Sequence, residues 1–209
     1  MTPTPEEHVP VLIVGGGYAG LAASLFLSNQ SARSQLVDRH PGVSIQGRAR
    51  GINPRTIEIY RALGLAEAVR EAGKPFQGDN GIVRCQTLAG EWEWIFEAEA
   101  PTSFPEWSAG EFVMADQNSV EPVLVQAVRD RGADLRFDTP LVSFEAAADG
   151  VAAMVADRAT GEQRTIRADY LIAADGNRSP IREQLRIARP PRRTPEASRA
   201  QARSSARTE

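Results

Sequence analysis

Three glycines near the amino terminus have the spacing of a nucleotide-binding turn. Gly15, Gly17 and Gly20 fill the glycine positions of the pattern G-x-G-x-x-G. In such a turn the first glycine permits a sharp bend, the second lets a pyrophosphate approach the backbone, and the third lets helix and strand pack closely. Unpaired N–H groups at the start of the following helix attract phosphate oxygens. The spacing therefore predicts dinucleotide binding, with a purely structural glycine turn as the alternative.

An acidic residue lies where this kind of site needs one. Asp38 follows the segment 35–37, which has strand character, and lies 18 residues after Gly20. Its carboxylate can accept hydrogen bonds from the two hydroxyls of a ribose, and it would repel a 2′-phosphate. Arg39, the next residue, completes this part of the candidate cofactor site.

A strand, a helix and a second strand must position these residues. The apolar run 11–14 precedes the glycines and predicts a buried strand, and the run 21–27 predicts a helix. The second strand is expected over residues 35–37, immediately before Asp38. This order predicts an α/β fold of the Rossmann type.

Further helices are indicated by their end signals and by apolar periodicity. The first, over residues 54–63, has an asparagine before it and a glycine after it, and a shorter one is expected over 65–72. Apolar residues recur at helical spacing from 118 to 131. Asn118 and Glu121 are predicted to form a capping pair at the start of that helix.

Two tryptophans alternate along a predicted strand. The segments 81–84 and 91–96 have strand character, and Trp92 and Trp94 would lie on one face of the second. With Trp107 these side chains could line an aromatic pocket. A buried sheet face is the favoured interpretation of such a stripe.

The last patterned region predicts an antiparallel meander. Strands are expected over 141–144, 151–157 and 164–167, because Asp-Gly and Thr-Gly turns separate these runs. A buried strand over 170–174 and a helix over 179–185 follow.

The composition changes sharply from residue 188 onward. The segment 188–209 is rich in arginine and contains no large apolar residue, so we expect it to be disordered. The predicted organisation is therefore an incomplete domain over residues 1–187 followed by a tail over 188–209.

The totals exclude several classes of function. A net charge of −3 without a basic face argues against nucleic-acid binding. The sequence contains no run of 18 apolar residues, the length that a membrane-spanning helix needs. The single cysteine, Cys85, cannot form an internal disulfide, which favours a reducing cytoplasm. The two histidines are too few for a zinc site, so no metal is expected. No catalytic triad or carboxylate pair is visible, and no catalytic residue is predicted.

Two further segments select among nucleotide-binding folds. Residues 48–56 and 168–179, taken with the glycine turn and Asp38, resemble the FAD-dependent aromatic hydroxylases, which are single-component flavoprotein monooxygenases. The branch that hydroxylates phenols and polyketides is the most similar. The resemblance covers about residues 9–185 and implies a Rossmann-like FAD-binding fold.

The resemblance also implies roles for further residues. The glycine turn and Asp38 would hold the ADP half of FAD. Arg48, favoured over Arg50, would lie beside the flavin, and Gln117 would contact the cofactor. Asp175 and Gly176 would serve both the FAD pyrophosphate and NAD(P)H.

The function implied is hydroxylation of an aromatic or polyketide substrate with NAD(P)H and O2. Members of that family carry a second half, with a Gly-Asp-Ala motif and the substrate-binding sheet, which this sequence lacks. We therefore expect the FAD-binding portion of such an enzyme, inactive alone because it is truncated. A non-catalytic nucleotide-binding remnant and an NAD-linked reductase are the alternatives, and neither substrate nor oligomeric state is predicted.

Overall fold

The computed structural model describes residues 6–46, 48–76, 78, 81–96, 103 and 105–188. Its contacts divide the chain into two units, Met1–Asn177 and Arg178–Glu209. The segment 189–209, which holds nearly all of the predicted tail, lies outside the described residues. The domain boundary after residue 187 stays a prediction.

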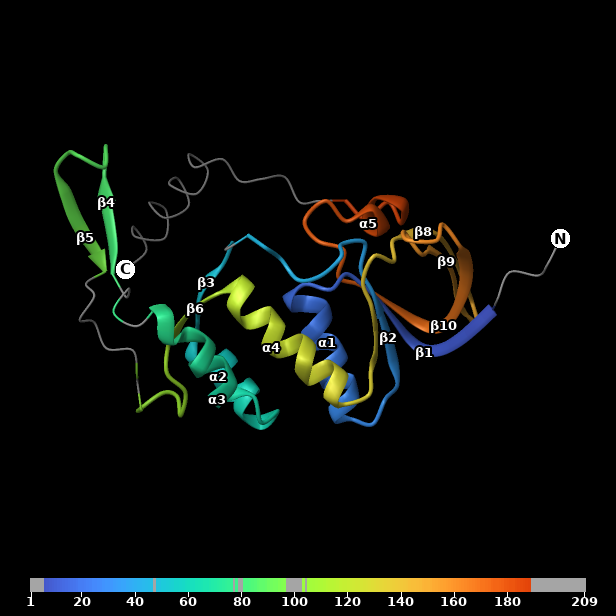
Figure 1. Ribbon diagram of the computed structural model, residues 1–209, viewed down its shortest axis with the longest axis horizontal. Helices are drawn as coiled ribbons and strands as arrows, with labels where there is room; N and C mark the ends of the chain where they lie inside the picture. Colours follow the sequence, from blue (N-terminus) through green and yellow to red (C-terminus); the bar gives the residue numbers. More distant parts are fainter. Residues whose placement is uncertain are drawn as a thin grey trace, which may run out of the picture. The chain divides into compact units, whose positions relative to one another are not determined.

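The largest sheet of the first unit has six strands in the order β7-β2-β1-β10-β9-β8, and the helices α1 (Tyr18–Asn29) and α4 (Gln117–Asp130) lie beside it (Figure 1). Its strands are β1 (Glu6–Val14), β2 (Ser34–Val37), β7 (Asp134–Arg136), β8 (Leu141–Ala147), β9 (Gly150–Ala156) and β10 (Gln163–Ala173). Strands β7, β2, β1 and β10 are parallel to one another, and β8 and β9 continue the sheet in antiparallel pairing. This architecture confirms the predicted Rossmann-like fold with an antiparallel meander.

Residues 11–14 of strand β1 are apolar and buried, because the sheet is covered on both faces there. Leu12 and Ile13 point to opposite faces and are both fully buried. A parallel strand covered on both sides reads as a continuous apolar run, which is why it could be recognised from sequence.

Strand β10 corrects two predictions. The runs 164–167 and 170–174 were expected as separate strands, but they belong to one strand that pairs with both β9 and β1. The second run was also expected to be buried, yet Tyr170 is 71% exposed. Pairing of β10 with β9 stops at Ala168, so Tyr170 lies on the stretch that extends beyond it.

The helices of the first unit are α1 (Tyr18–Asn29), α2 (Pro54–Ala62), α3 (Ala66–Gly73) and α4 (Gln117–Asp130), with a short 3-10 helix η1 (Lys74–Phe76) after α3. Helices α1 and α4 pack side by side (Figure 1). Their buried faces meet in the core through Leu21, Leu25, Val120 and Leu124. In the part of the chain that the structure describes, no helix is long and apolar enough to cross a membrane.

Helix caps confirm one prediction and correct another. Asn53 accepts a hydrogen bond from the Thr56 backbone N–H at 2.8 Å, as expected for the N-cap of α2. Helix α4 instead begins at Gln117, so the predicted cap residue Asn118 already lies inside the helix. Glu121 is not part of a capping pair, because its side chain turns inward and is buried.

Two small ribbons complete the first unit: β3 (Arg50–Ile52) with β6 (Val113–Asp116), and β4 (Ile82–Cys85) with β5 (Trp92–Phe96). Trp92 and Trp94 share a face, with rings 5.5 Å apart at 81°. Their exposed fractions are 60% and 46%, and Trp107 is 82% exposed. The predicted buried sheet face is therefore wrong, since within the described residues the β4–β5 ribbon pairs with no third strand.

The described part of the second unit contains α5 (Pro180–Gln184). The Ser179 hydroxyl accepts a hydrogen bond from the Arg182 backbone N–H at 3.2 Å. Ser179 is therefore the N-cap of α5, the helix that the sequence predicts over 179–185.

Candidate functional site

The glycine turn joins β1 to α1 at the carboxyl edge of the parallel strands. Gly15 has a φ of +114°, and a Cβ at this position would overlap the Ala174 carbonyl oxygen. A Cβ at Gly20 would overlap the Gly15 carbonyl oxygen. At Gly17, by contrast, a Cβ would meet only Glu121 Oε1, at 3.7 Å. The outer two glycines are thus required by packing, whereas Gly17 leaves open space.

That open space lies at the amino end of α1. Gly17 is the N-cap residue, and among the described residues no side chain caps this helix end. Its first turn carries no acidic residue. The first N–H groups of a helix lack partners inside the helix, so this end presents donors and the positive pole of the helix dipole. The geometry suits a phosphate group.

Tyr18, the first residue of α1, is half-buried beside this helix end. Burial raises its pKa, and the neighbouring Tyr60, Glu121 and Asp116 raise it further. The phenol therefore stays neutral at physiological pH and places no negative charge beside the turn.

Asp38 follows β2 and faces the glycine turn. One carboxylate oxygen accepts a hydrogen bond from the Gly16 backbone N–H at 2.5 Å, and the other accepts from His40 N–H at 2.7 Å. Asp38 therefore braces the turn, a role that the sequence pattern did not indicate. Each oxygen keeps a further lone pair for a ribose hydroxyl. Arg39 is exposed and its Nε lies 3.2 Å from His40 Nε2.

The two candidate arginines have different surroundings. Arg50 donates to both carboxylate oxygens of Asp116, at 2.7 and 3.2 Å, and its guanidinium lies 5.1 Å from the centre of the Phe76 ring. The hydrogen bond from Arg50 is the main reason that the pKa of Asp116 is lowered. Arg48 is exposed, and its Nε donates to the Gln46 side chain at 2.9 Å. A bidentate carboxylate pair restricts Arg50, so Arg48 is the better candidate to meet a ligand.

Gln117 begins α4 and touches the arginine loop. Its backbone N–H donates to the Ala49 carbonyl at 3.0 Å, and its side-chain amide donates to Glu121 Oε1 at 2.6 Å. The other oxygen of Glu121 accepts from the Ser44 backbone N–H at 2.8 Å. Glu121 is 1% exposed, which makes it a buried carboxyl group at the candidate site.

Asp175 and Gly176 follow β10 at the same edge of the sheet as the glycine turn. The preceding residue, Ala174, donates its N–H to the Val14 carbonyl at 2.8 Å. Asp175 N would lie 3.0 Å from a Cβ at Gly15. Gly176 has a φ of +89° with nothing within 4 Å of its Cβ position, so backbone conformation selects glycine there.

The structure brings the predicted residues together in two neighbouring groups. One group lies at the carboxyl ends of the parallel strands and holds the glycine turn, Asp38 and Asp175. The other lies at the start of α4 and holds Gln117 with the loop of Arg48. Glu121, whose Oε1 approaches Gly17, lies between the two groups. It was missed as a site residue because an acid at helical spacing has no sequence signal that distinguishes a buried position from a surface one.

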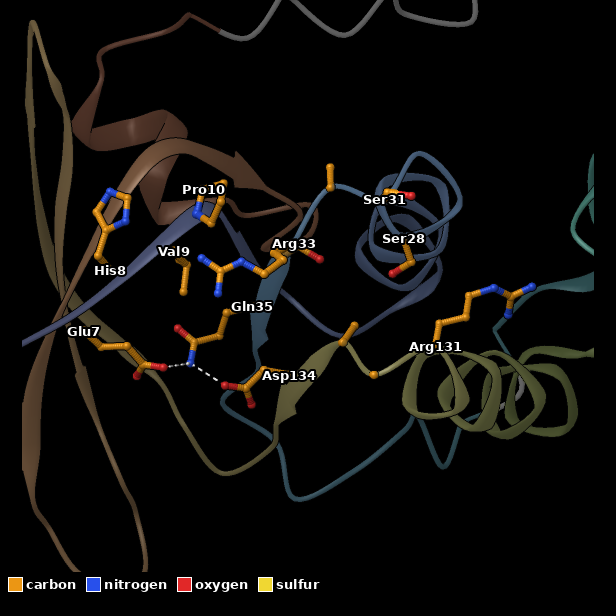
Figure 2. A pocket seen from close by; sticks show the side chains of 14 residues that line it. Glu7, His8, Val9, Pro10, Ser28, Ser31, Arg33, Gln35, Arg131 and Asp134 are labelled. Carbon is orange, nitrogen blue, oxygen red and sulfur yellow. Dashed lines mark hydrogen bonds between the residues drawn. The ribbon is translucent and has the colours of Figure 1, made fainter.

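A pocket of about 350 Å³ lies at the opposite, amino-terminal edge of β1, β2 and β7 (Figure 2). None of the predicted cofactor residues lines it. Its labelled charged and amide side chains are Glu7, His8, Arg33, Gln35, Arg131 and Asp134. The pocket is polar, yet many of its polar side chains already hydrogen-bond to other residues.

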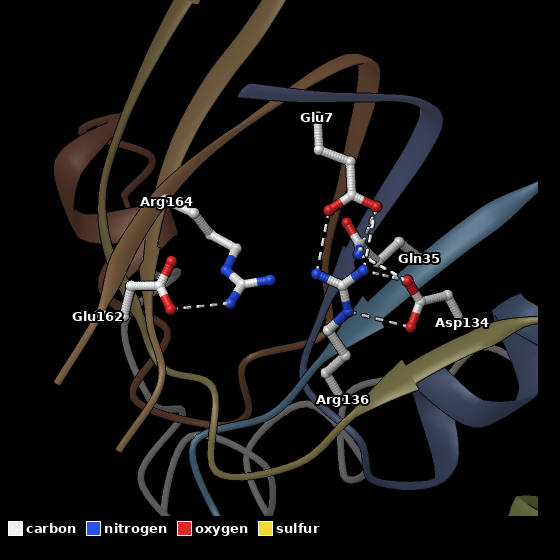
Figure 3. A network of polar contacts seen from close by, with 6 residues as sticks. All are labelled: Glu7, Gln35, Asp134, Arg136, Glu162 and Arg164. Carbon is white, nitrogen blue, oxygen red and sulfur yellow. Dashed lines mark hydrogen bonds and ion pairs between the residues drawn. The ribbon is translucent and has the colours of Figure 1, made fainter. Parts of the chain in front are cut away.

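Four of the side chains around this edge form a network (Figure 3). The Arg136 guanidinium lies between Glu7 and Asp134 and donates to both carboxylates, at 2.6 to 3.1 Å. The Gln35 amide donates to Asp134 at 2.8 Å and to Glu7 at 3.4 Å. Its Oε1 is buried without a partner among the described residues. The orientation is forced, because turning the amide would aim that oxygen at two carboxylates.

Known proteins match this chain over most of its length. A family model described as "FAD binding domain" matches residues 8–202. A Streptomyces coelicolor protein provisionally named a polyketide hydroxylase is 47% identical over 183 residues, which are 87% of this chain and 29% of that protein. Aklavinone 12-hydroxylase DnrF of Streptomyces peucetius subsp. caesius is 42% identical, over 88% of this chain and 39% of that protein. The chain therefore spans about 30 to 40% of these curated relatives.

Solved structures give the same similarity. The flavin-dependent monooxygenase PieE, solved with FAD and substrate, is 40% identical with a TM-score of 0.74 over 87% of this chain and 32% of that one. Aklavinone-11 hydroxylase, solved with FAD and aklavinone, is 34% identical with a TM-score of 0.75 over 90% of this chain and 36% of that one.

Proposed function

The chain belongs to the family of FAD binding domains, and from this premise we propose that it is the FAD-holding part of a flavin-dependent monooxygenase. The complete enzyme hydroxylates an aromatic or polyketide substrate with NAD(P)H and O2, in the cytoplasm. The names of the relatives support this class of substrate, since they include hydroxylases of aklavinone and of other polyketides.

The observation that carries the proposal is the open amino end of α1 above Gly17. The FAD pyrophosphate is anionic, and this helix end offers N–H donors with no competing side-chain cap among the described residues. The space at Gly17 lets phosphate oxygens reach those donors. The donor set and the cradle therefore fit a dinucleotide.

Each remaining residue has a proposed place along the cofactor. Asp38 accepts hydrogen bonds from the adenosine ribose, and Arg39 flanks it. Gln117 and Arg48 lie on the flavin side, where the Gln117–Ala49 hydrogen bond keeps them together. Asp175 and Gly176 complete the pyrophosphate side and face NAD(P)H.

FAD, when bound, supplies the redox and oxygen-transfer chemistry, and no side chain of this chain is proposed to react. The protein's tasks are to bind and orient the cofactor and to exclude water. The remaining two thirds of the relatives have no counterpart in these 209 residues. We therefore propose that the 209-residue chain alone binds FAD but does not hydroxylate, because water reaches the reacting centre.

Cofactor binding is tested directly by purifying the chain and recording its absorption spectrum. Flavin bands in the protein fraction, and quenching of FAD fluorescence on titration, are the expected results. A colourless preparation that also fails to bind added FAD contradicts the proposal. Binding of NAD but not FAD would instead support an NAD-linked reductase, and binding of neither would support a non-catalytic remnant.

Catalytic competence needs a separate assay. With FAD, NADPH and simple phenols, the chain is expected to oxidise NADPH slowly, giving hydrogen peroxide and no hydroxylated product. Stoichiometric hydroxylation by the 209-residue chain would overturn the proposed incompetence while leaving FAD binding intact.

A further inference from the structure

Glu121 is a buried carboxyl group to which the sequence assigned only a capping role. It lies on α4, one helical turn after Gln117, and is 1% exposed. Ser44 N–H donates to one oxygen and the Gln117 amide to the other. A buried carboxyl group is costly unless its oxygens are hydrogen-bonded, so these two donors are held tightly against it.

Hydrogen bonds continue from Ser44 along the loop to Arg48. The Ser44 hydroxyl donates to the Gln46 carbonyl at 3.2 Å and accepts from the Gln46 backbone N–H at 3.2 Å. Arg48 in turn donates its backbone N–H to the Gln46 carbonyl and its Nε to the Gln46 side chain, both at 2.9 Å. One carboxyl group therefore anchors the base of a loop whose exposed end is Arg48.

The same carboxyl group fixes the other side of this region. Its bond to the Gln117 amide sets the rotamer of the first residue of α4. Its Oε1 also lies 3.7 Å from the Cβ position of Gly17, so the anchor borders the open space of the glycine turn. Glu121 thus touches both halves of the candidate site without extending into solvent.

We propose that Glu121 is a positioning residue that sets Arg48 and Gln117 for the flavin half of the cofactor. The inference rests on the proposed FAD-binding function. It predicts that loss of the carboxylate weakens contacts with the flavin half more than contacts with the ADP half. The ADP half depends on the glycine turn and Asp38, which Glu121 does not hydrogen-bond.

The test uses the 209-residue chain and its Glu121→Gln variant. A glutamine has nearly the same volume but only one oxygen, so it can accept from Ser44 N–H only if its NH2 faces Gln117, and the Gln117 amide must then turn over from its present rotamer; otherwise Ser44 N–H loses its acceptor. The dissociation constant for FAD is expected to rise about tenfold, the scale of one hydrogen bond to a charged acceptor. The dissociation constant for ADP, which lacks the flavin half, is expected to change far less, and the visible spectrum of bound FAD is expected to shift.

A second measurement needs no cofactor. Hydrogen exchange of the Ser44 amide is expected to be faster in Glu121→Gln than in the parent chain, with little change in the thermal midpoint. Glu145→Gln, the same substitution at an exposed position of β8, is the matched control and should leave every readout unchanged.

The outcomes separate this inference from the function on which it rests. A parent chain that does not bind FAD contradicts the proposed function, while Ser44 exchange still tests the anchor. Unchanged Ser44 exchange, equal weakening of FAD and ADP, tighter FAD binding, or unfolding of the cofactor-free variant would each overturn the positioning role.

Discussion

The two edges of the parallel sheet use their polar groups in opposite ways. At the carboxyl edge the first N–H groups of α1 meet no side-chain cap among the described residues, and the space above Gly17 is open. At the amino edge Glu7, Asp134 and Arg136 satisfy one another (Figure 3). Within the described chain, the carboxyl edge offers N–H donors without a side-chain partner, whereas most polar side chains of the amino edge network already hydrogen-bond to one another.

This difference shows why a pocket lined by charged side chains is not by itself a guide to the site. The pocket of about 350 Å³ lies at the amino edge, and Glu7, Arg33, Arg131 and Asp134 are among its lining residues (Figure 2). A ligand there would have to compete with an arginine that already bridges two carboxylates. At the carboxyl edge no side-chain partner has to be displaced from the described helix end, so each hydrogen bond to a charged ligand contributes its net value of about 1.5–3 kcal/mol.

Among substitutions that test the difference between the two edges, Gly17→Val is expected to have the largest effect, which is a loss of FAD affinity. The cofactor-free fold has room for a Cβ here, since only Glu121 Oε1, at 3.7 Å, lies near that position. A bound pyrophosphate does not, and FAD affinity should fall by more than about 3 kcal/mol, the upper end of what overpacking a rigid contact costs. Circular dichroism with an FAD titration separates the two effects.

Gly20→Ala is the contrasting control for that experiment. A Cβ there overlaps the Gly15 carbonyl, so the thermal midpoint itself should drop. Retained FAD binding by Gly17→Val would contradict the proposed cradle.

Asp38→Ala is expected to weaken FAD binding by about 1.5–3 kcal/mol, the scale of hydrogen bonds to a charged group. Because Asp38 also accepts from Gly16 and His40 N–H, this variant combines lost ribose contacts with a loosened turn. Asp134→Ala, at the amino edge, is the matched substitution and should leave FAD affinity unchanged. Equal affinities of Asp38→Ala and the parent chain would remove Asp38 from the site.

Arg136→Met is expected to lower the stability of the fold and to leave FAD affinity unchanged, the reverse of Gly17→Val. It leaves Glu7 and Asp134 facing each other without their cation, and unfolding free energy should fall by about 2 kcal/mol, below the range for fully buried pairs because these side chains are partly exposed. Urea unfolding measures this loss. FAD affinity per folded molecule should not change, and a clear loss of affinity would show that the two edges are coupled.

The smallest effect concerns pH and the Arg50–Asp116 pair. The hydrogen bond from Arg50 lowers the pKa of Asp116, so the pair stabilises the folded chain above the carboxyl's ordinary pKa of 3.8 and loses this contribution as pH falls below it. Asp116→Asn should therefore lower the urea midpoint slightly at neutral pH and leave it unchanged in acid. Urea midpoints of both chains across acidic pH check this, and a difference that persists in acid contradicts it.

Much of the fold was predictable because its signals are local. The apolar run before Gly15 specified β1, and Asn53 specified the start of α2. The meander was recognised from its turns. The helix over 117–130 was recognised from apolar periodicity, although Asn118 was wrongly assigned as its cap, because cap geometry depends on where the preceding strand β6 ends.

The two errors about burial share one cause, which is that burial depends on segments distant in sequence. The alternation at Trp92 and Trp94 correctly indicated a strand with both rings on one face, but pattern alone does not say whether anything covers that face. Tyr170 was misjudged in the same way. Its apolar neighbours in sequence suggested burial, but the pairing of β10 with β9 ends at Ala168, before Tyr170.

By itself the sequence determined the glycine turn, the acid after β2 and the Rossmann-like class, because each depends on backbone geometry encoded by neighbouring residues. Only the tertiary structure decided that Asp38 braces Gly16, that Arg50 pairs with Asp116, and that Glu121 anchors Ser44. These contacts join residues 22, 66 and 77 positions apart. No local pattern encodes such pairs, because the two partners come within hydrogen-bonding distance only once the chain has folded.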